Sequence, residues 1–393
     1  MGKYLKKFEN HSQYENYMDG GGVALPNVSY CVTEGDVHYN PFSYANEYLT
    51  FVAKESGTFT FTPQNDNVIS YSTDGGETWT EGNSVTVNNG DEVMWKGTMT
   101  PTLYNGIGKF SSTAEFNVQG NAMSLLYGDN YKGETDLTDK NSFYQLFANN
   151  KKVINAKNLS LPATTLTDGC YVAMFQYCTS LTTAPELPAT TLADGCYVAM
   201  FRGCTSLTTA PELPATTLAS YCYSGMFQGC TSLTTAPELL STGLIIECYK
   251  DMFQGCTSLT TAPELPATTL AYNCYGSMFQ GCTSLTTAPE LSATTLVDYC
   301  YSSMFKGCTS LTTAPVLPAT TLVGWCYQNM FNGCTSLNYI KAMFTTEPTW
   351  TRTQNWVSGV AATGTFVKNS AAQWDVSGVN GVPDGWTVQT ASA

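Results

Sequence analysis

Charged side chains are scarce in this 393-residue chain, and histidine is almost absent. Asp, Glu, Lys and Arg make up 12% of the residues, and the two histidines are His11 and His38. A Ser-His-Asp or Cys-His arrangement needs a positioned histidine, and none can be built convincingly from these two. Glycine-rich strings with a phosphate-loop pattern are also missing. We therefore expect a protein that is not an enzyme and that uses no cofactor.

Basic residues and long apolar runs are the other shortages. Seventeen basic residues against thirty-one acidic ones leave a formal charge of −14, which repels a phosphate backbone and argues against a nucleic-acid partner. No apolar run is long enough to cross a bilayer, so membrane insertion is not expected. No apolar stretch follows Lys3, Lys6 and Lys7, so we predict synthesis and folding in a cytoplasm without a secretion signal.

Cysteine is abundant, and its spacing is regular. A fixed period without insertions indicates coils that stack on one another, so residues 161–342 are predicted to form a solenoid of seven 26-residue repeats. Of the fifteen cysteines, only Cys31 lies outside this pattern. The first of each pair is Cys170, Cys196, Cys222, Cys248, Cys274, Cys300 or Cys326, and the second is Cys178, Cys204, Cys230, Cys256, Cys282, Cys308 or Cys334.

One repeat, LPATTLADGCYVAMFRGCTSLTTAPE, divides into two parts. Cys196, Met200 and Cys204 recur every four residues beside Phe201, a spacing that predicts a helix of about two turns. Leu207 lies in the following threonine-rich segment, where two prolines prevent a helix and a short strand is expected. These five residues are the predicted core of the repeat. The predicted class is β-rich α+β, with a short strand and a short helix in each coil.

The repeat cysteines are expected to be buried free thiols that pack as small apolar groups. Two thiols eight residues apart on a helix lie about 12 Å apart, beyond the reach of a disulfide. Folding in a cytoplasm keeps thiols reduced. The spacing C-x7-C matches no zinc pattern, so no metal is predicted here.

The string CYxxMFxGCTSLTTAPELPATTLA, which recurs over about half of the chain, carries a family resemblance. It resembles the BspA-like leucine-rich repeats that are common in proteins of gut Bacteroidetes and their phages. The resemblance implies a binding surface or a rigid spacer rather than a catalyst.

Residues 46–128 have a different pattern, with alternating apolar and polar residues between Gly, Asn and Asp turns. This pattern predicts a small antiparallel β-sandwich. Within it, Ser72, Asp74, Gly76, Thr78 and Trp79 resemble the Asp-box hairpin of sialidases and other β proteins. The resemblance implies a structural turn, and contact with a glycan is the alternative.

The remaining segments flank these two regions. Val153 and Ala156 keep the strand spacing without cysteines, so residues 129–160 are predicted to be a degenerate coil that caps the repeats. Residues 343–393 are predicted to be the C-terminal cap, with a strand in GTFVKN. Residues 1–45 are a leader for attachment, with disorder as the alternative. Its opening resembles an N-terminal stretch of uncharacterised gut Bacteroides and phage-encoded proteins.

The residues around each Cys-Tyr pair vary between copies, and this edge is the candidate binding site. Aromatic side chains occur here at Tyr221, Tyr272, Tyr299 and Trp325, and exposed aromatics are common anchors of recognition. Neutral drift of the sequence is the alternative explanation. A second column, of acidic residues that ends at Val316, is expected to be a solvated ridge rather than a calcium site: Glu186, Glu212, Glu238, Glu264 and Glu290.

Two functions compete. The first is a phage virion protein, either a head or tail fibre or a decoration protein. It would attach to other virion proteins through the leader, form a homo-oligomer with a trimer favoured, and present the solenoid to a host surface protein or glycan such as mucin. The alternative is an adhesin on the bacterial cell surface. A glycan-processing enzyme is a third class, which rests on the Asp box alone.

Overall fold

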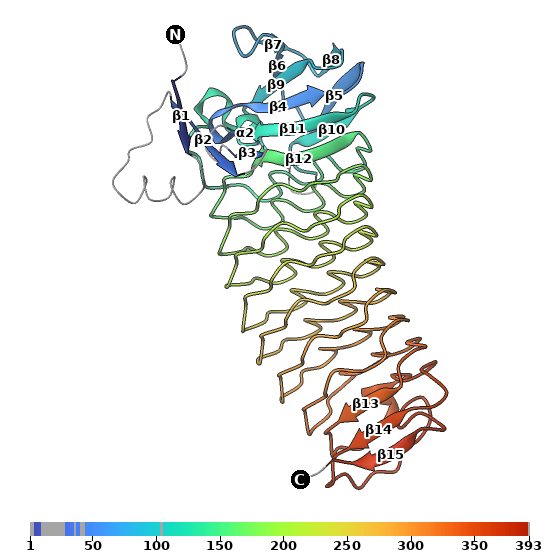
Figure 1. The fold of residues 1–393 in the computed structure, drawn as a ribbon. Coiled ribbons are helices and arrows are strands. Elements are labelled where there is room, and N and C mark those ends of the chain that lie inside the picture. Colours follow the sequence, from blue (N-terminus) through green and yellow to red (C-terminus); the bar gives the residue numbers. More distant parts are fainter. Residues whose placement is uncertain (1–3, 9–27, 35–36, 40–43, 103–104, 392–393) are drawn as a thin grey trace.

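The computed structural model describes residues 4–8, 28–34, 37–39, 44–102 and 105–391. The sheets formed within residues 49–160 lie at one end, and a stack of coils runs from them to a small sheet near the C-terminus (Figure 1). In the leader, β1 (Tyr4–Phe8) pairs in parallel with β2 (Val28–Glu34), which pairs antiparallel with β3 (Val37–Tyr39). Residues 1–3, 9–27, 35–36 and 40–43 of the proposed attachment segment lie outside the described residues.

Two sheets follow the leader. One has six strands in the order β12-β11-β4-β9-β6-β7, and the other has three in the order β10-β5-β8. All pairings among β4 to β11 are antiparallel, as predicted, while β12 adds to β11 in parallel. The elements are η1 (Tyr44–Asn46), β4 (Leu49–Ala53), β5 (Gly57–Pro63), β6 (Ile69–Ser72), β7 (Thr80–Glu81), β8 (Ser84–Val87), β9 (Glu92–Gly97), β10 (Gly108–Ser112), β11 (Phe116–Asn121), α2 (Ser124–Tyr127), η2 (Gly128–Asn130) and β12 (Val153–Ser160).

Aromatic side chains fill the space between the two sheets. Phe51 of β4 contacts Phe59 of β5 and Phe110 of β10, with ring centroids 5.4 and 4.7 Å apart. Phe147, from the segment before the first repeat, lies 5.8 Å from Phe51 and stacks on Phe175 of the first repeat at 5.1 Å. The apolar core therefore continues from the sheets into the coils.

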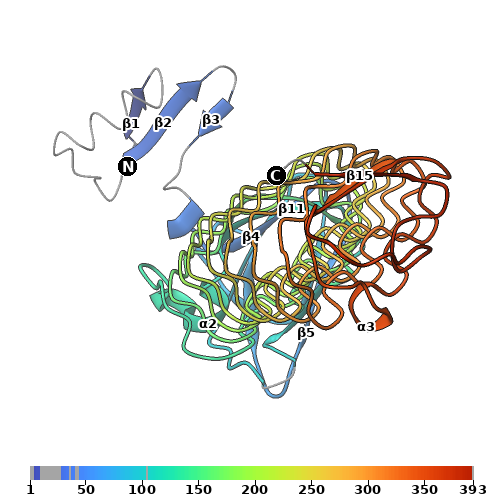
Figure 2. The same cartoon turned by 90° about the horizontal axis from the view of Figure 1, so that it is seen from below.

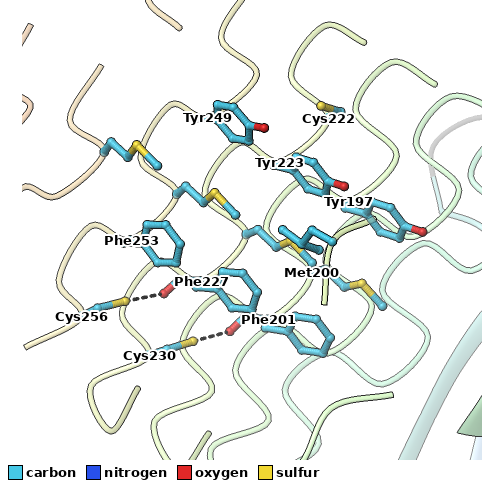
Figure 3. Close-up of a cluster of buried hydrophobic side chains, with 14 of the residues drawn as sticks. Tyr197, Met200, Phe201, Cys222, Tyr223, Phe227, Cys230, Tyr249, Phe253 and Cys256 are labelled. Carbon is cyan, nitrogen blue, oxygen red and sulfur yellow. Dashed lines mark hydrogen bonds between the residues drawn. The ribbon is translucent and has the colours of Figure 1, made fainter. Parts of the chain in front are cut away.

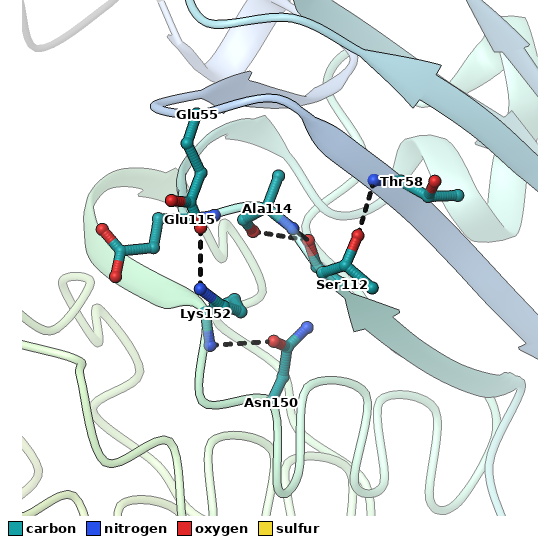
Figure 4. Close-up of polar contacts among 8 residues, drawn as sticks. Glu55, Thr58, Ser112, Ala114, Glu115, Asn150 and Lys152 are labelled. Atoms are coloured by element: carbon teal, nitrogen blue, oxygen red, sulfur yellow. Dashed lines mark hydrogen bonds and ion pairs between the residues drawn. The ribbon is translucent and has the colours of Figure 1, made fainter.

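Polar contacts join the sheets to the coils at the same place. Lys152 Nζ lies 2.7 Å from Glu55 Oε1, and the Lys152 amide donates to Asn150 Oδ1 at 3.1 Å (Figure 4). The hydrogen bond from Lys152 lowers the pKa of the Glu55 carboxyl. Asn150 Nδ2 donates to the Phe110 carbonyl of β10 at 3.3 Å. These bonds fix the register of the first coil against the sheets.

The segment between the two cysteines of each repeat is a ribbon of overlapping turns, so the predicted helix is wrong. Successive amides alternate between two kinds of acceptor. The Met200 amide donates to the Tyr197 carbonyl in its own turn at 3.2 Å. The Phe201 amide donates to the Met226 carbonyl of the next coil at 2.9 Å. Half of the donors that a helix would use internally thus join neighbouring coils.

A left-handed residue at every fourth position sets the period of this ribbon. In the second repeat these residues are Gly195, Ala199 and Gly203, with φ of 61°, 53° and 73°. The ribbon and a helix both place every fourth side chain on one face, so the spacing of Cys196 and Met200 could not separate them. The glycines at two of the left-handed positions favour the ribbon, because glycine adopts positive φ without a steric cost.

The threonine-rich segment forms isolated parallel bridges in most repeats instead of the predicted short strand. Thr209 bridges to Thr183 in the coil before it and to Thr235 in the coil after it. Pro211 and its equivalents lack an amide hydrogen and cannot extend the ladder. A strand, β13 (Tyr339–Ala342), forms only in the seventh repeat, where the equivalent prolines are replaced.

Equivalent side chains of successive coils form columns in the interior. Tyr197 and Tyr223 stack with ring centroids 5.8 Å apart, and Phe201 and Phe227 stack at 5.7 Å (Figure 3). Viewed along the stack, the coils overlie one another with a progressive offset (Figure 2). The predicted core residues are all fully buried: Cys196, Met200, Phe201, Cys204 and Leu207.

The fourteen repeat thiols are free and buried. Cys230 Sγ donates to the Phe201 carbonyl of the preceding coil at 3.1 Å, and the same bond recurs from Cys256 to Phe227 (Figure 3). The thiols therefore add hydrogen bonds between coils as well as filling space. Burial raises the pKa of the Cys230 thiol to about 12, so the reactive thiolate is disfavoured at neutral pH.

The hydrogen bonds between coils extend beyond both ends of the seven repeats. Before them, the Phe147 amide donates to the Met174 carbonyl at 2.8 Å. After them, the Phe331 amide donates to the Trp356 carbonyl at 2.7 Å. Residue 342 is thus no break in the stack. The last segment contains α3 (Trp350–Thr353), β14 (Thr365–Lys368), which lies in the predicted GTFVKN strand, and β15 (Thr387–Thr390), with β13, β14 and β15 in one parallel sheet.

The left-handed column of glycines that includes Gly255 allows a first test of the ribbon. Gly255 has φ of +73°, a region that a β-branched residue rarely adopts. We expect Gly255→Val to lower the free energy of unfolding by about 1–3 kcal/mol. The control is Gly243→Ala, because Gly243 has no left-handed φ and no atom within 4 Å of an added Cβ. Equal urea midpoints for the two variants would contradict the ribbon geometry.

Candidate binding edge

The variable edge of the repeats lies at the start of the turn ribbon. Tyr221, Tyr299 and Trp325 occupy its first left-handed position, with φ of 60°, 62° and 57°. In the first two repeats the same position holds Gly169 and Gly195. Large side chains with positive φ are outliers, because Cβ approaches the backbone too closely. Such strain costs on the order of 1–3 kcal/mol and concentrates at functional sites.

The structure brings three of the four predicted residues together and adds a fourth ring. The centroid distance is 5.5 Å from Tyr272 to Tyr299 and 6.1 Å from Tyr299 to Trp325. Trp325 contacts Trp350 edge to face at 4.9 Å. Trp350 was predicted only as part of the cap. It lies 26 residues after Gly324, so extending the repeat by one copy would have placed it on this edge.

Isoleucine side chains continue the edge toward Tyr221. Ile246 lies 26 residues before Tyr272, at the equivalent position of the preceding coil. The Ile246 carbonyl accepts a hydrogen bond from the Tyr221 amide at 3.0 Å. Tyr221 and Tyr272 are each 44% exposed, and Trp350 is 58% exposed. Tyr299 and Trp325 are half-buried. We name as the aromatic stripe the six residues Tyr221, Ile246, Tyr272, Tyr299, Trp325 and Trp350.

Uncharged polar side chains lie farther along the same ribbon. Gln228 Nε2 donates to Gln254 Oε1 of the next coil. Gln328 Nε2 donates to Gln354 Oε1 at 2.7 Å, and Ser302 Oγ donates to Gln328 Oε1 at 3.3 Å. The four glutamine side chains are partly exposed, whereas Ser302 is buried. The ribbon that carries the stripe therefore also carries amide groups that can hydrogen-bond a ligand without carrying charge.

Charged groups near the stripe have partners within the protein. Asp298 Oδ1 accepts the Gly324 amide at 2.9 Å. Glu247 pairs with Lys250 at 2.8 Å. Arg352 donates to the Glu347 carbonyl at 3.0 Å. The edge thus offers apolar rings and neutral hydrogen-bonding groups, and these four charged side chains each have a hydrogen-bond or ionic partner within the protein.

The Asp box uses its polar groups to close its own turn. Asp74 accepts hydrogen bonds from Ser72 Oγ at 2.7 Å and from the Thr78 amide at 3.0 Å. The Gly76 amide donates to Ser72 Oγ at 2.9 Å. The hydrogen bonds from Ser72 and Thr78 hold the pKa of the Asp74 carboxyl far below its usual range. Such a network fits the structural turn that the resemblance implies.

Trp79 of the same hairpin packs within the domain. Its ring lies 4.8 Å from that of Tyr48 and 4.1 Å from Lys96 Nζ. Lys96 also pairs with Asp129 at 2.7 Å. These contacts fit a structural role for Trp79 within the hairpin.

The other candidate sites are dispersed or outside the described part of the chain. The side chains of the acidic column are exposed to solvent in every repeat that carries one. No cluster of three or more potential metal ligands occurs among the described residues. His11 lies outside the described residues, and the side chain of His38 is not described. No helix in the described segments is long and apolar enough to span a membrane.

These features define a protein of stacked leucine-rich coils with buried columns of aromatic rings and thiols and with an aromatic edge at the surface. Residues 168–312 and 247–348 match the BspA type leucine rich repeat region, in six copies. The chain therefore carries BspA-type repeats. Five of the six members of the stripe, from Tyr221 to Trp325, lie inside the match, and Trp350 lies after its last residue. No curated protein matches the chain, and no solved structure matches it.

Proposed function

We propose that this chain is a non-enzymatic binding protein that recognises a ligand on a biological surface through the aromatic stripe. Its repeats form a solenoid that holds the stripe rigid. The observation that carries the proposal is a row of large side chains, four of them exposed and two half-buried, with three at left-handed positions where glycine is the unstrained residue. The match to BspA-type repeats supports a binding role based on the repeats.

A rigid aromatic edge suits recognition for two physical reasons. Tyrosine and tryptophan bury a large apolar area with little loss of conformational entropy, and they dominate the energetics of many interfaces. The hydrogen bonds between coils hold each ring in place before a ligand arrives, which lowers the entropic cost of binding. Adjacent coils then offer several contacts to one ligand.

Substitution of the left-handed aromatics by glycine separates binding from folding. We expect Trp325→Gly and Tyr299→Gly to weaken binding to a mucin-coated surface or to whole bacterial cells at least tenfold, measured by biolayer interferometry and cell sedimentation. Their melting temperatures should stay within a few degrees of the unmodified protein, because the fold already accepts glycine at Gly169 and Gly195.

Tyr177→Gly is the matched control. Tyr177 is 40% exposed and has φ of 57°, but it lies at a different position of the ribbon. Its replacement should leave binding unchanged. The proposal is wrong if the protein binds neither surface, or if the stripe variants bind as tightly as the Tyr177 control.

The biological setting is a further part of the proposal. The resemblance of the leader favours a virion fibre or decoration protein, assembled as a trimer with other virion proteins through residues 1–45. The BspA-type repeats equally suit an adhesin on the bacterial cell surface. Mass spectrometry of purified phage particles and of bacterial surface fractions distinguishes the two settings. Sedimentation equilibrium tests the trimer.

A further inference from the structure

We infer that the ligand of the aromatic stripe is an uncharged glycan chain that lies along the stack and contacts several coils. This inference rests on the proposed binding function and names its ligand class. The aromatic rings and the amide side chains of the edge support it together. A sugar unit presents an apolar C–H face and a rim of hydroxyls, and the edge presents Trp325 and Trp350 beside the amide side chains of Gln328 and Gln354.

The charges of the edge favour a neutral ligand. Asp298 and Arg352 hydrogen-bond to backbone groups, and Glu247 forms an ion pair with Lys250. Together they contribute two negative and two positive charges, so they give no net attraction for a charged ligand. The net charge of −14 opposes a polyanionic one. Sulfated glycans, uronic acid polymers and nucleic acids are therefore disfavoured.

The backbone of the edge argues against an extended peptide. A peptide that adds to a sheet needs free amides and carbonyls along its edge. Here the Tyr221 amide donates to the Ile246 carbonyl at 3.0 Å, and the Trp325 amide donates to the Thr351 carbonyl at 2.6 Å. The donors that a peptide strand would use are thus consumed between coils. Recognition must come from side chains, which suits a sugar chain better than a strand.

The period of the stripe matches a polymer. The rings of the stripe follow one another at centroid distances of 5.5, 6.1 and 4.9 Å, which is close to the length of one pyranose unit. The four rings from Tyr272 to Trp350 occupy successive coils. Trp350 is 58% exposed and offers the most open ring, while Tyr299 and Trp325 are half-buried. Adjacent sugar units can thus contact adjacent rings, so affinity should rise with chain length.

Oligosaccharides of defined length and charge test the inference. The probes are cellohexaose, chitohexaose and maltohexaose, their disaccharides, and a galacturonic acid hexamer as the anionic control. Binding is followed by tryptophan fluorescence and calorimetry on the full chain. We expect at least one neutral hexamer to bind at least tenfold more tightly than its disaccharide. Trp325→Gly and Trp350→Ala should abolish that binding, and Tyr177→Gly should preserve it.

The outcomes separate the glycan from the binding function. The inference is overturned if no neutral hexamer binds at millimolar concentration, or if the anionic hexamer binds as tightly as the best neutral one. If neutral hexamers fail to bind while the stripe variants still lose mucin or cell binding, the glycan class is wrong and the binding function stands. If the stripe variants keep their surface binding, the proposed function fails as well.

Discussion

Raising the pH from about 8 to about 10 is expected to unfold the stacked repeats. Burial raises the pKa of thiols such as Cys170, Cys222 and Cys230 from 9.0 to about 12. A buried thiol whose pKa is raised in the folded state makes its full contribution to stability when the pH is below the pKa of the thiol in the unfolded chain. This contribution is lost as the pH rises through the pKa of the thiol in the folded chain. The window is therefore about pH 9 to 12, in which the unfolded chain releases protons that the folded chain retains.

The number of thiols makes this effect large. One pH unit above the unfolded pKa, each buried thiol favours unfolding by about 1.4 kcal/mol. Fourteen such thiols together exceed about 10 kcal/mol if the coils unfold as one unit, which is comparable with the stability of a typical protein. Buried tyrosines such as Tyr197 act in the same direction, because burial also raises their pKa well above 10.0.

Urea unfolding followed by circular dichroism at several pH values measures the effect. Replacing Cys230 and Cys256 by alanine should reduce the stability lost between pH 8 and pH 10 by about 1.4 kcal/mol for each thiol removed. A stability that stays constant from pH 8 to pH 10 would show that the thiols are accessible to water in the folded state.

Replacing Phe227 by Asp is expected to disrupt the stack at its centre. Phe227 is fully buried, and its ring stacks on Phe201 and Phe253 with centroids 5.7 Å apart on each side. An unpaired carboxylate at this point has no compensating charge among its ring neighbours. We expect a loss of more than about 4 kcal/mol in the free energy of unfolding, or a chain that does not fold.

The conservative variant Phe227→Leu separates charge from packing. It keeps an apolar side chain of moderate size and should cost about 1–2 kcal/mol. The exposed variant Thr234→Asp, on the threonine-rich face, should cost less than either core substitution. A melting curve for Phe227→Asp that matches the unmodified protein would show that Phe227 lies outside the core.

The repeat and its core could be predicted from the sequence because each position recurs in seven copies. Cysteines at a constant 26-residue interval fix the offset between coils, and that offset decides which side chains meet. The local conformation could not be derived in the same way. Cys196, Met200 and Cys204 have the same spacing in a helix and in the turn ribbon, and only the hydrogen bonds to the next coil distinguish them. Gly203 also suits the end of a helix, so it did not separate the two; Gly195 and Gly203 have positive φ at two of the left-handed positions of the ribbon.

The candidate site was predicted in part. The four predicted aromatics stand at the variable edge, since variation between copies marks positions that the core does not constrain. Trp350 was missed because the cap has no cysteines to show that it continues the register. Hydrogen bonds such as the one from the Phe331 amide to the Trp356 carbonyl join the cap to the seventh repeat in the same register. Trp350 contacts Trp325 because of this register. Strain at Tyr299 and Trp325 depends on φ, which residue types alone do not reveal.

The most direct test of the account is the accessibility of the thiols, because in-register stacking creates both the dry interior and the exposed stripe. The native protein is treated with iodoacetamide near neutral pH, and the mass of the intact chain is measured. We predict that the fourteen repeat thiols stay unmodified until the chain is denatured. Rapid modification of the repeat thiols in the native protein would contradict the stacked geometry on which the proposed binding edge depends.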